Sequence, residues 1–394
     1  MRKKNQVMYH MQQWFWLPKQ LYPNNQNTNY SGFADNSSGN YTVAEFLRTF
    51  EYSEPIISAE LTFSGDTLFQ LFCSGECIAT GPAAVGGDFR ANDQPCRWYY
   101  SLQETVYPCS NCLELFARVQ MLPYQLCDYS KGHGGFMLYG TITLASGAQH
   151  TICTDENWLA RKNKAFLSPR CYDSTLAPDP YITAQIVPDI WNTTVAPIPV
   201  RREHELFPKD CRIHLQPGEK LKKKLELDHI YAGFLRVLVK THGIVKAQII
   251  CREFEEQHYI DHFTFTENTD YRGFTLFSAG NILAVFENCS DFPTEITISF
   301  IATCYPVAHQ ATITTDDPDL NALLAVCKHT LQYCRQTHHL DSPRHCEPPA
   351  CTGDYYNETL MTHFSFGDLR LAEFDLLRTA KMLEAEDGRL FHTS

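Results

Sequence analysis

The sequence predicts a mainly β protein with an α-helical segment at its C-terminal end. Before residue 310, hydrophobic and polar residues alternate with a period of two in many short runs, as in strands with one buried face. After residue 315 the period changes to 3.6, which is typical of amphipathic helices. Short strands with glycine-rich turns and no intervening helices indicate two antiparallel β-sandwich domains, and a separate helical unit follows them.

The composition sets limits on the class of protein. The chain has 394 residues, enough for two or three domains, and its 44% hydrophobic and 13% aromatic content excludes a disordered or fibrous chain. The net charge of −12 provides no broad basic surface, so we expect no nucleic-acid partner. No run of 18 apolar residues occurs, so we expect no membrane span.

The role expected for the sixteen cysteines depends on whether the protein is in a reducing or an oxidising compartment. The N-terminus begins with basic residues, but residues 8–20 contain His, Gln and Lys where a signal peptide needs an apolar core, which predicts a cytoplasmic protein. In a reducing compartment the cysteines are expected to be small buried hydrophobic residues. A zinc site remains the weaker alternative for the closely spaced pairs, which are Cys73 with Cys77, Cys109 with Cys112, and Cys346 with Cys351.

The first β domain is predicted over residues 1–186. In residues 113–121, Leu, Leu, Ala, Val and Met alternate with Glu, Phe, Arg and Gln, which predicts a strand with one buried face. Similar runs predict strands at residues 67–73 and 136–144, and Gly-containing turns follow or precede them.

A proline-rich linker and a second β domain come next. Four prolines fall within residues 187–208, which predicts an extended connection between domains. The second sandwich is expected over residues 209–310. Its basic run at residues 219–226 can be an anion site or a solvated strand face, and the mixed charges favour the solvated face. The strands expected here are residues 234–239, 244–251, 281–286 and 296–302.

The helical unit is predicted over residues 311–394. Asp317 is a suitable N-cap, with Pro318 at the first helical position and an apolar stripe that continues to Cys334. A second helix is expected over residues 355–366, ended by Gly367, and a third begins with Asp368 as its cap and runs to Leu383.

Residues that can carry chemistry concentrate in the segment that joins the first two helices. Residues 338–354 contain carboxylates, an Arg and three His, and the prolines among them prevent a continuous helix. A rigid polar loop of this kind suits a sugar site, because carboxylates accept hydrogen bonds from sugar hydroxyls and a partly buried one can protonate a leaving oxygen. The acidic and basic candidates are Asp341, Arg344, Glu347 and Asp354.

Three other interpretations of this segment stay open. Its acids can simply cap the helices and pair with Arg344. A metal site is a second alternative, although the spacing matches no zinc pattern. A cysteine nucleophile with a histidine base is a third. The residues that these last two interpretations use are His338, His339, His345, Cys346, Glu347 and Cys351.

The order of motifs in this segment resembles a known family. Asp341-Ser-Pro, then Glu347, then Thr352-Gly353-Asp354 is similar to the signature of the bacterial α-L-rhamnosidases of glycoside hydrolase family 78. Weaker similarities precede it along most of the chain. They include Trp14-Phe-Trp16, Ser74-Gly75 with Gly81-Pro82, Asp155-Glu-Asn-Trp158, Leu215-Gln-Pro-Gly218 and Tyr231-Ala-Gly233.

The resemblance implies roles for particular residues. Glu347 matches the family's general acid, Asp341 and Asp354 match acids that bind the rhamnose hydroxyls, and Arg344 lies near the motif arginine. It implies no metal or cofactor and a rhamnose-containing glycoside or oligosaccharide as partner. Cys351 stands where the family has a Trp, so a related six-hairpin glycosidase with another sugar stays open.

The resemblance also implies inverting hydrolysis, in which a second carboxylate across the sugar activates water. The family's catalytic domain is an (α/α)6 barrel, and the roughly 80 residues after Thr315 suffice for three or four helices. The expectation is therefore an incomplete barrel with exposed apolar helix faces, which lacks the general base.

Two alternatives belong to other classes. One is a carbohydrate-binding β-sandwich protein with a remnant catalytic segment, in which aromatic side chains stack on sugars or, alternatively, pack in the core. The other is an enzyme that a second chain completes, and assembly of identical copies is also left open. The aromatic residues considered for stacking are Trp98, Tyr99, Tyr100 and Trp158.

Overall fold

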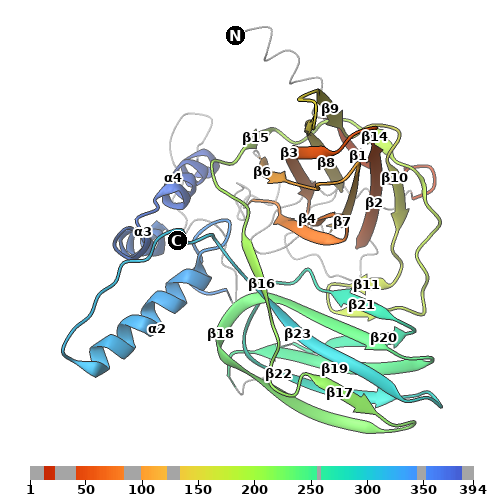
Figure 1. Cartoon of the computed structure of the whole chain (residues 1–394). Helices are drawn as coiled ribbons and strands as arrows, with labels where there is room; N and C mark the ends of the chain where they lie inside the picture. Colours follow the sequence, from red (N-terminus) through yellow and green to blue (C-terminus); the bar gives the residue numbers. More distant parts are fainter. Residues whose placement is uncertain are drawn as a thin grey trace.

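The computed structural model describes residues 13–22, 41–83, 99–121, 134–254, 259–343 and 352–383. Figure 1 shows two β units, one above the other, with three helices along one side of both. The mainly β class and the helical C-terminal segment are confirmed. None of the helices in the described ranges is long and apolar enough to cross a membrane.

Two sheets form the first β unit. The first sheet has the order β14-β1-β8-β3-β6-β15, with β9 beside β8, and the second has the order β13-β10-β2-β7-β4-β5. The strands of the first sheet are β1 (Trp14–Trp16), β3 (Ile56–Asp66), β6 (Tyr99–Val106), β8 (Gly135–Leu144), β9 (Gln149–Cys153), β14 (Gln185–Val187) and β15 (Thr193–Val195). Those of the second are β2 (Thr42–Glu51), β4 (Leu68–Cys73), β5 (Glu76–Gly81), β7 (Cys112–Met121), β10 (Leu159–Lys162) and β13 (Ile182–Thr183).

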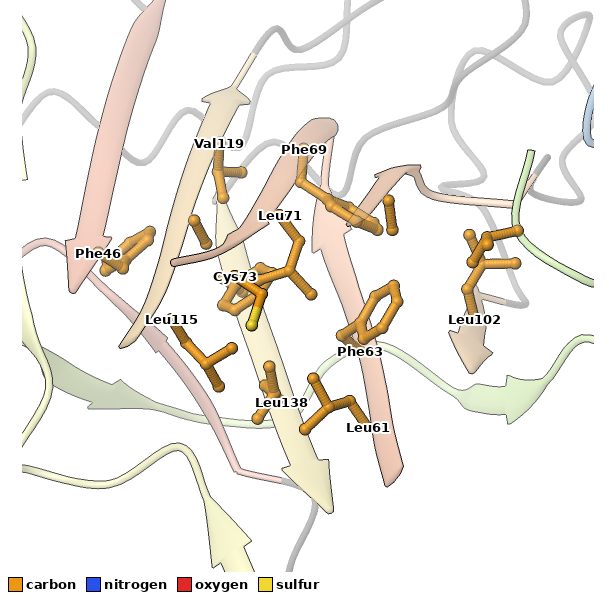
Figure 2. Packing of buried hydrophobic residues seen from close by; sticks show 14 of the residues in the cluster. Phe46, Leu61, Phe63, Phe69, Leu71, Cys73, Leu102, Leu115, Val119 and Leu138 are labelled. Atoms are coloured by element: carbon orange, nitrogen blue, oxygen red, sulfur yellow. The ribbon is translucent and has the colours of Figure 1, made fainter. Parts of the chain in front are cut away.

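The core of this unit lies between the two sheets. Figure 2 shows Leu61 and Phe63 of β3 facing Leu71 of β4 and Leu115 of β7 across the sandwich. The alternation in β7 predicted this arrangement, because every second residue of the strand is buried in the core. The strands expected at residues 67–73, 113–121 and 136–144 are confirmed as β4, β7 and β8.

A ten-stranded sheet forms the second β unit. Its order is β11-β12-β20-β19-β22-β18-β23-β16, with β17 beside β23 and β21 beside β18. The long curved strand β18 in Figure 1 pairs with β22, β23 and β21 in turn, and its register shifts between Glu226 and Tyr231. The strands are β11 (Phe166–Ser168), β12 (Cys171–Asp173), β16 (Arg202–Leu206), β17 (Arg212–Leu215), β18 (Lys220–Lys240), β19 (Ile244–Arg252), β20 (Asp261–Thr266), β21 (Thr269–Arg272), β22 (Phe277–Asn288) and β23 (Thr294–Cys304).

The basic run at the start of β18 is a solvated strand face. Lys220 pairs with Glu287, Lys224 pairs with Glu226, and both lysines lie at the surface. Leu225 points the other way and is fully buried. The charges are therefore balanced locally, and the interpretation as an anion site has no support.

The chain passes between the two β units more than once. β11 and β12 precede residue 186 but belong to the ten-stranded sheet, whereas β15 follows it and pairs with β6 of the first unit. β15 and β12 are also parallel to their partners, which is possible because each lies more than 80 residues from its partner along the chain. The strands thus interleave between the two units. The single domain boundary near residue 186 stays a prediction.

Three helices follow the sheets: α2 (Pro318–Cys334), α3 (Thr352–Phe366) and α4 (Arg370–Leu383). The predicted caps are confirmed. Asp317 accepts hydrogen bonds from the backbone N–H groups of Asp319 and Leu320, and Asp368 accepts one from that of Arg370. Gly367 ends α3 with a φ of +68°, a conformation that glycine adopts without a steric penalty.

The helices pack on both β units. Tyr333 of α2 meets Tyr231 of β18 edge to face, with 4.9 Å between ring centroids, and Phe374 of α4 meets Tyr100 of β6 in the same way. The opposite sides carry apolar residues that are open to solvent, among them Val326 (64% exposed) and Leu376 (72%). The expected exposure of the predicted apolar stripes is confirmed for Leu323 and Leu377, whereas Leu331 and Phe374 of the same stripes are buried.

Candidate functional site

The segment that follows α2 brings two of the four predicted site residues to the start of α3. Asp341 lies at the surface seven residues after the end of α2, and Asp354 is exposed in the first turn of α3. Arg344 and Glu347 lie outside the described residues. Their predicted roles therefore stay predictions.

Hydrogen bonds of the Gln336 side chain connect the segment before Asp341 to the second β unit, to α2 and to the connection between the two units. The Gln336 amide donates to the carbonyl oxygens of Thr303 and Tyr333, at 2.8 and 2.9 Å. Arg201, from the connection between the two units, donates to the Gln336 side chain at 3.3 Å. The turn that leads to Asp341 is therefore fixed between the end of α2, β23 of the second β unit and the connection between the units.

A buried contact fixes the same segment to α3 and α4. His339 Nδ1 lies 2.8 Å from Asp375 Oδ2, and the backbone N–H of His339 donates to the same oxygen at 3.0 Å. Arg378 donates to the other oxygen of Asp375 at 3.0 Å. Burial opposes ionisation of Asp375, but these donors and charges outweigh it and lower its pKa.

The contact extends to a hydroxyl group, because His339 Nε2 lies 3.1 Å from Thr362 Oγ1. A hydroxyl, an imidazole and a carboxylate in sequence are the parts of a nucleophilic triad. Here all three side chains are at most 2% exposed, so no substrate reaches Thr362. The arrangement is a structural link between the polar segment and both helices.

Cysteine chemistry has no support at this place. The Cys334 thiol is buried, and burial together with the nearby carboxylates of Glu358 and Asp341 raises its pKa to about 12. A thiol of this kind stays protonated and is a poor nucleophile. Cys346 and Cys351, the cysteines predicted as alternatives, lie outside the described residues.

A metal site has no support in the described part of the segment either. His339 is committed to Asp375 and Thr362. His338 is buried, and burial, helped by the charge of Arg378, lowers its pKa to about 3. Within the described ranges no group of three or more His, Cys, Asp or Glu residues is placed to hold a metal ion.

Glu358 is a buried acid beside the two predicted aspartates that the sequence did not indicate. It lies one helical turn after Asp354 on α3 and is 7% exposed. Burial raises its pKa to about 8, and the negative charges of Asp375, Asp354 and Asp341 add to the effect. The sequence signal that could have identified Glu358 is its four-residue spacing from Asp354, because this spacing places both acids on one face of a helix.

The aromatic residues considered for sugar stacking pack in the core. Tyr99 and Trp158 are fully buried, and Tyr100 is 4% exposed and contacts Phe374 of α4. Trp98 lies outside the described residues. The carbohydrate-binding interpretation therefore loses the three described side chains on which it rested.

No family model matches the chain, and no curated protein matches it in sequence. Solved structures do match. A GH78 family rhamnosidase of Bacillus sp. GL1 superposes with a TM-score of 0.67 at 10% identity, over 94% of this chain and 66% of that one. The α-L-rhamnosidase from Dictyoglomus thermophilum gives 0.62 at 13% identity, over 96% and 45%. The enzyme of Streptomyces avermitilis, complexed with L-rhamnose, gives 0.61 at 14% identity, over 89% and 37%.

These matches establish the fold of the chain. Over most of its length it has the fold of the family 78 α-L-rhamnosidases, so the resemblance noted in its motifs is confirmed at the level of fold. The chain spans no more than about two thirds of the length of the structures it matches.

Proposed function

We propose that the chain belongs to a glycoside hydrolase that binds and cleaves terminal α-L-rhamnosides. The observation that carries the proposal is the placement of Asp341, in the segment after α2, and Asp354, in the first turn of α3, where the charges of both act on the buried Glu358, in a fold shared with rhamnosidases. Ionised carboxylates there accept hydrogen bonds from sugar hydroxyls. The buried link of His339 to Asp375 keeps the Asp341 segment in place for this role.

In the proposed reaction Glu347 is the general acid, and hydrolysis inverts the anomeric carbon. Inversion requires a second carboxylate roughly 6.5–9.5 Å from the acid, with room for water between them. We assign that base to no residue of this chain. Arg344 is proposed as a further contact to the sugar.

We also propose that the protein works in a reducing compartment such as the cytoplasm. Every cysteine that the structure describes is a free thiol, which supports this location. The proposed partner is a rhamnose-containing glycoside or oligosaccharide, and the proposal involves neither nucleic acid nor a membrane. An assembly of identical copies stays a proposal without support from a contact in the structure.

The test of this function is the binding of L-rhamnose to the full chain, measured by calorimetric titration. We expect the wild-type chain to bind and Asp354→Asn and Asp341→Asn each to weaken binding by about tenfold or more, because hydrogen bonds to a charged group contribute roughly 1.5–3 kcal/mol. Asp291→Asn, an exposed acid in the second β unit, is the matched control and should bind as the wild type does.

Two results would contradict the proposal: no binding of L-rhamnose to the intact chain, or equal affinities in Asp354→Asn and the control. The role of Glu347 is tested separately with an aryl α-L-rhamnoside. If the chain turns this substrate over, Glu347→Gln should abolish turnover, and NMR should detect the β-anomer of rhamnose first. Turnover that survives Glu347→Gln would exclude Glu347 as the acid.

A further inference from the structure

A buried path of hydrogen bonds runs through α4 and joins the segment before Asp341 to the start of α3. It begins at His339, whose backbone N–H and Nδ1 lie 3.0 and 2.8 Å from Asp375 Oδ2. The other oxygen of Asp375 accepts a hydrogen bond from Arg378 Nη2 at 3.0 Å. The same nitrogen donates to the hydroxyl of Tyr355 at 3.2 Å, so the path ends on α3.

The two ends of the path lie beside the two predicted sugar-binding acids. His339 precedes Asp341 by two positions, and the backbone N–H of Leu340 between them donates to a carbonyl oxygen at the end of α2, at 2.8 Å. Tyr355 directly follows Asp354. The path therefore connects the backbone beside one acid to the backbone beside the other.

The members of the path have little freedom to move. Asp375 is 2% exposed and Arg378 is 0% exposed, so water does not replace a hydrogen bond that either of them loses. His339 Nε2 lies 3.1 Å from Thr362 Oγ1, which holds the imidazole from its second side. A guanidinium presents its donors in a fixed planar geometry, so Arg378 also holds its two acceptors at a fixed spacing.

Stability alone does not account for the buried ion pair of Asp375 with Arg378. Burial removes both charges from water, and their attraction offsets this loss only in good geometry, so well-packed apolar residues are often as stable or more stable in the same place. Directional hydrogen bonds supply what apolar packing lacks, because each is made within a narrow range of distance and angle. A role in placing the groups at the two ends of the path accounts for the pair.

We propose that Arg378 is a positioning residue that sets the separation of Asp341 and Asp354, so that both carboxylates bind hydroxyl groups of one monosaccharide. The inference deepens the proposed function and rests on it. A binding site needs its groups within roughly 0.5 Å of the productive geometry, so a small displacement of α3 from the Asp341 segment is enough to weaken binding. Because the hydroxyl groups of different sugars differ in position, the same separation selects among sugars.

The test compares the affinities of the full chain for L-rhamnose and for 6-deoxy-L-glucose, its epimer at the second carbon, by calorimetric titration. Tyr355→Phe removes the hydroxyl that accepts from Arg378 and leaves the ring in place. We expect it to bind L-rhamnose about tenfold more weakly, as the loss of a hydrogen bond to a charged group predicts, and to discriminate less between the two sugars than the wild type does. Tyr356→Phe is the matched control, because it removes the same atom from the exposed neighbouring residue, and it should bind both sugars as the wild type does.

Arg378→Lys tests the path without a contact to the sugar, because Arg378 is sealed from solvent. Lys keeps the buried charge beside Asp375 but lacks the planar guanidinium, so we expect the same loss of affinity and of discrimination. Thermal unfolding of each variant is measured in parallel. A merely structural role would lower Tm and leave the ratio of the two affinities unchanged.

An unchanged ratio of affinities in Arg378→Lys would overturn the role of Arg378 alone. If Arg378→Lys does not fold, an unchanged ratio in Tyr355→Phe overturns it equally, because this variant removes only a hydroxyl. Absence of L-rhamnose binding by the wild type would overturn the proposed function as well.

Discussion

Asp375 and Glu358, two buried acids of the same region, have opposite pKa shifts because the charges of their neighbouring side chains differ. His339 and Arg378 hold Asp375 ionised despite its burial, so its pKa falls. Its contribution to stability is present above its ordinary pKa and is lost as the pH falls through the folded value. Glu358 has a raised pKa, so its contribution is full below pH 4.5 and is lost as the pH rises to about 8.

Arg335 is a buried cation whose removal is expected to stabilise the chain. The side chain is 0% exposed and lies between the rings of Tyr305 and Phe366, with its carbon at 4.6 and 4.8 Å from their centroids. Its three side-chain nitrogens have no hydrogen-bond partner in the described residues. Burial of a cation without such partners costs several kcal/mol, which exceeds the roughly 2 kcal/mol that a desolvated cation–π contact returns.

We therefore expect Arg335→Met to raise the free energy of unfolding by about 1–2 kcal/mol, measured by urea denaturation at pH 7. Met has a similar volume and keeps contact with both rings. Arg212→Met, at an exposed position of β17, is the control and should change stability by less than about 0.5 kcal/mol. A loss of stability in Arg335→Met larger than in the control would show that the guanidinium has a favourable partner.

At the residue scale the sequence indicated the polar segment but not the contacts that hold it. Asp341 and Asp354 were identified from their types and spacing. The pairing of His339 with Asp375 could not be predicted, because the two residues are 36 positions apart and belong to different elements. Only the packing of the helices brings them together.

At the scale of elements, end signals and periodicity predicted most of the secondary structure. Asp317, Gly367 and Asp368 mark helix ends as expected, and the period-two runs became strands. The periodicity of a strand did not predict whether its polar face is exposed or covered. Gln120 of β7 is 1% exposed and accepts a hydrogen bond from the Tyr41 hydroxyl, because this face of the first unit is also covered.

Gly367 allows a direct measurement of one helix end. Its φ of +68° is unfavourable for any residue with a Cβ, and no atom stands within 4 Å of the added Cβ. We expect Gly367→Ala to lower the free energy of unfolding by about 1–2 kcal/mol through backbone strain alone, measured by thermal or urea denaturation. Gly367→Asn should cost less, because Asn tolerates this conformation.

The control for this substitution lies in the same helix. Gly353 has no positive φ and also has open space around its missing Cβ, so Gly353→Ala removes a glycine from a helix without strain. It should leave stability unchanged or raise it by up to about 1 kcal/mol. Equal effects of the two alanine substitutions would mean that the conformation of Gly367 does not limit the end of α3.

At the scale of the whole molecule, the polar segment before α3 contacts the second β unit, the connection between the two β units, and the helices α3 and α4. Gln336 contacts the second β unit through Thr303, Arg201 reaches it from the connection between the units, and His339 links it to α3 and α4. The order of two β units and a helical unit could be predicted from changes of period along the chain. The interleaving of strands such as β15 between the units could not, because three-residue strands carry no periodicity.

The central claim is that a rhamnose site opens at Asp341 and Asp354, and a crystal structure of the full chain with L-rhamnose bound tests it most directly. The account predicts the sugar with its hydroxyl oxygens within hydrogen-bond distance of both carboxylates, close to Glu358 and above the buried link of His339 to Asp375. A sugar bound on the surface of either β unit, with Asp341 and Asp354 free of it, would contradict the claim.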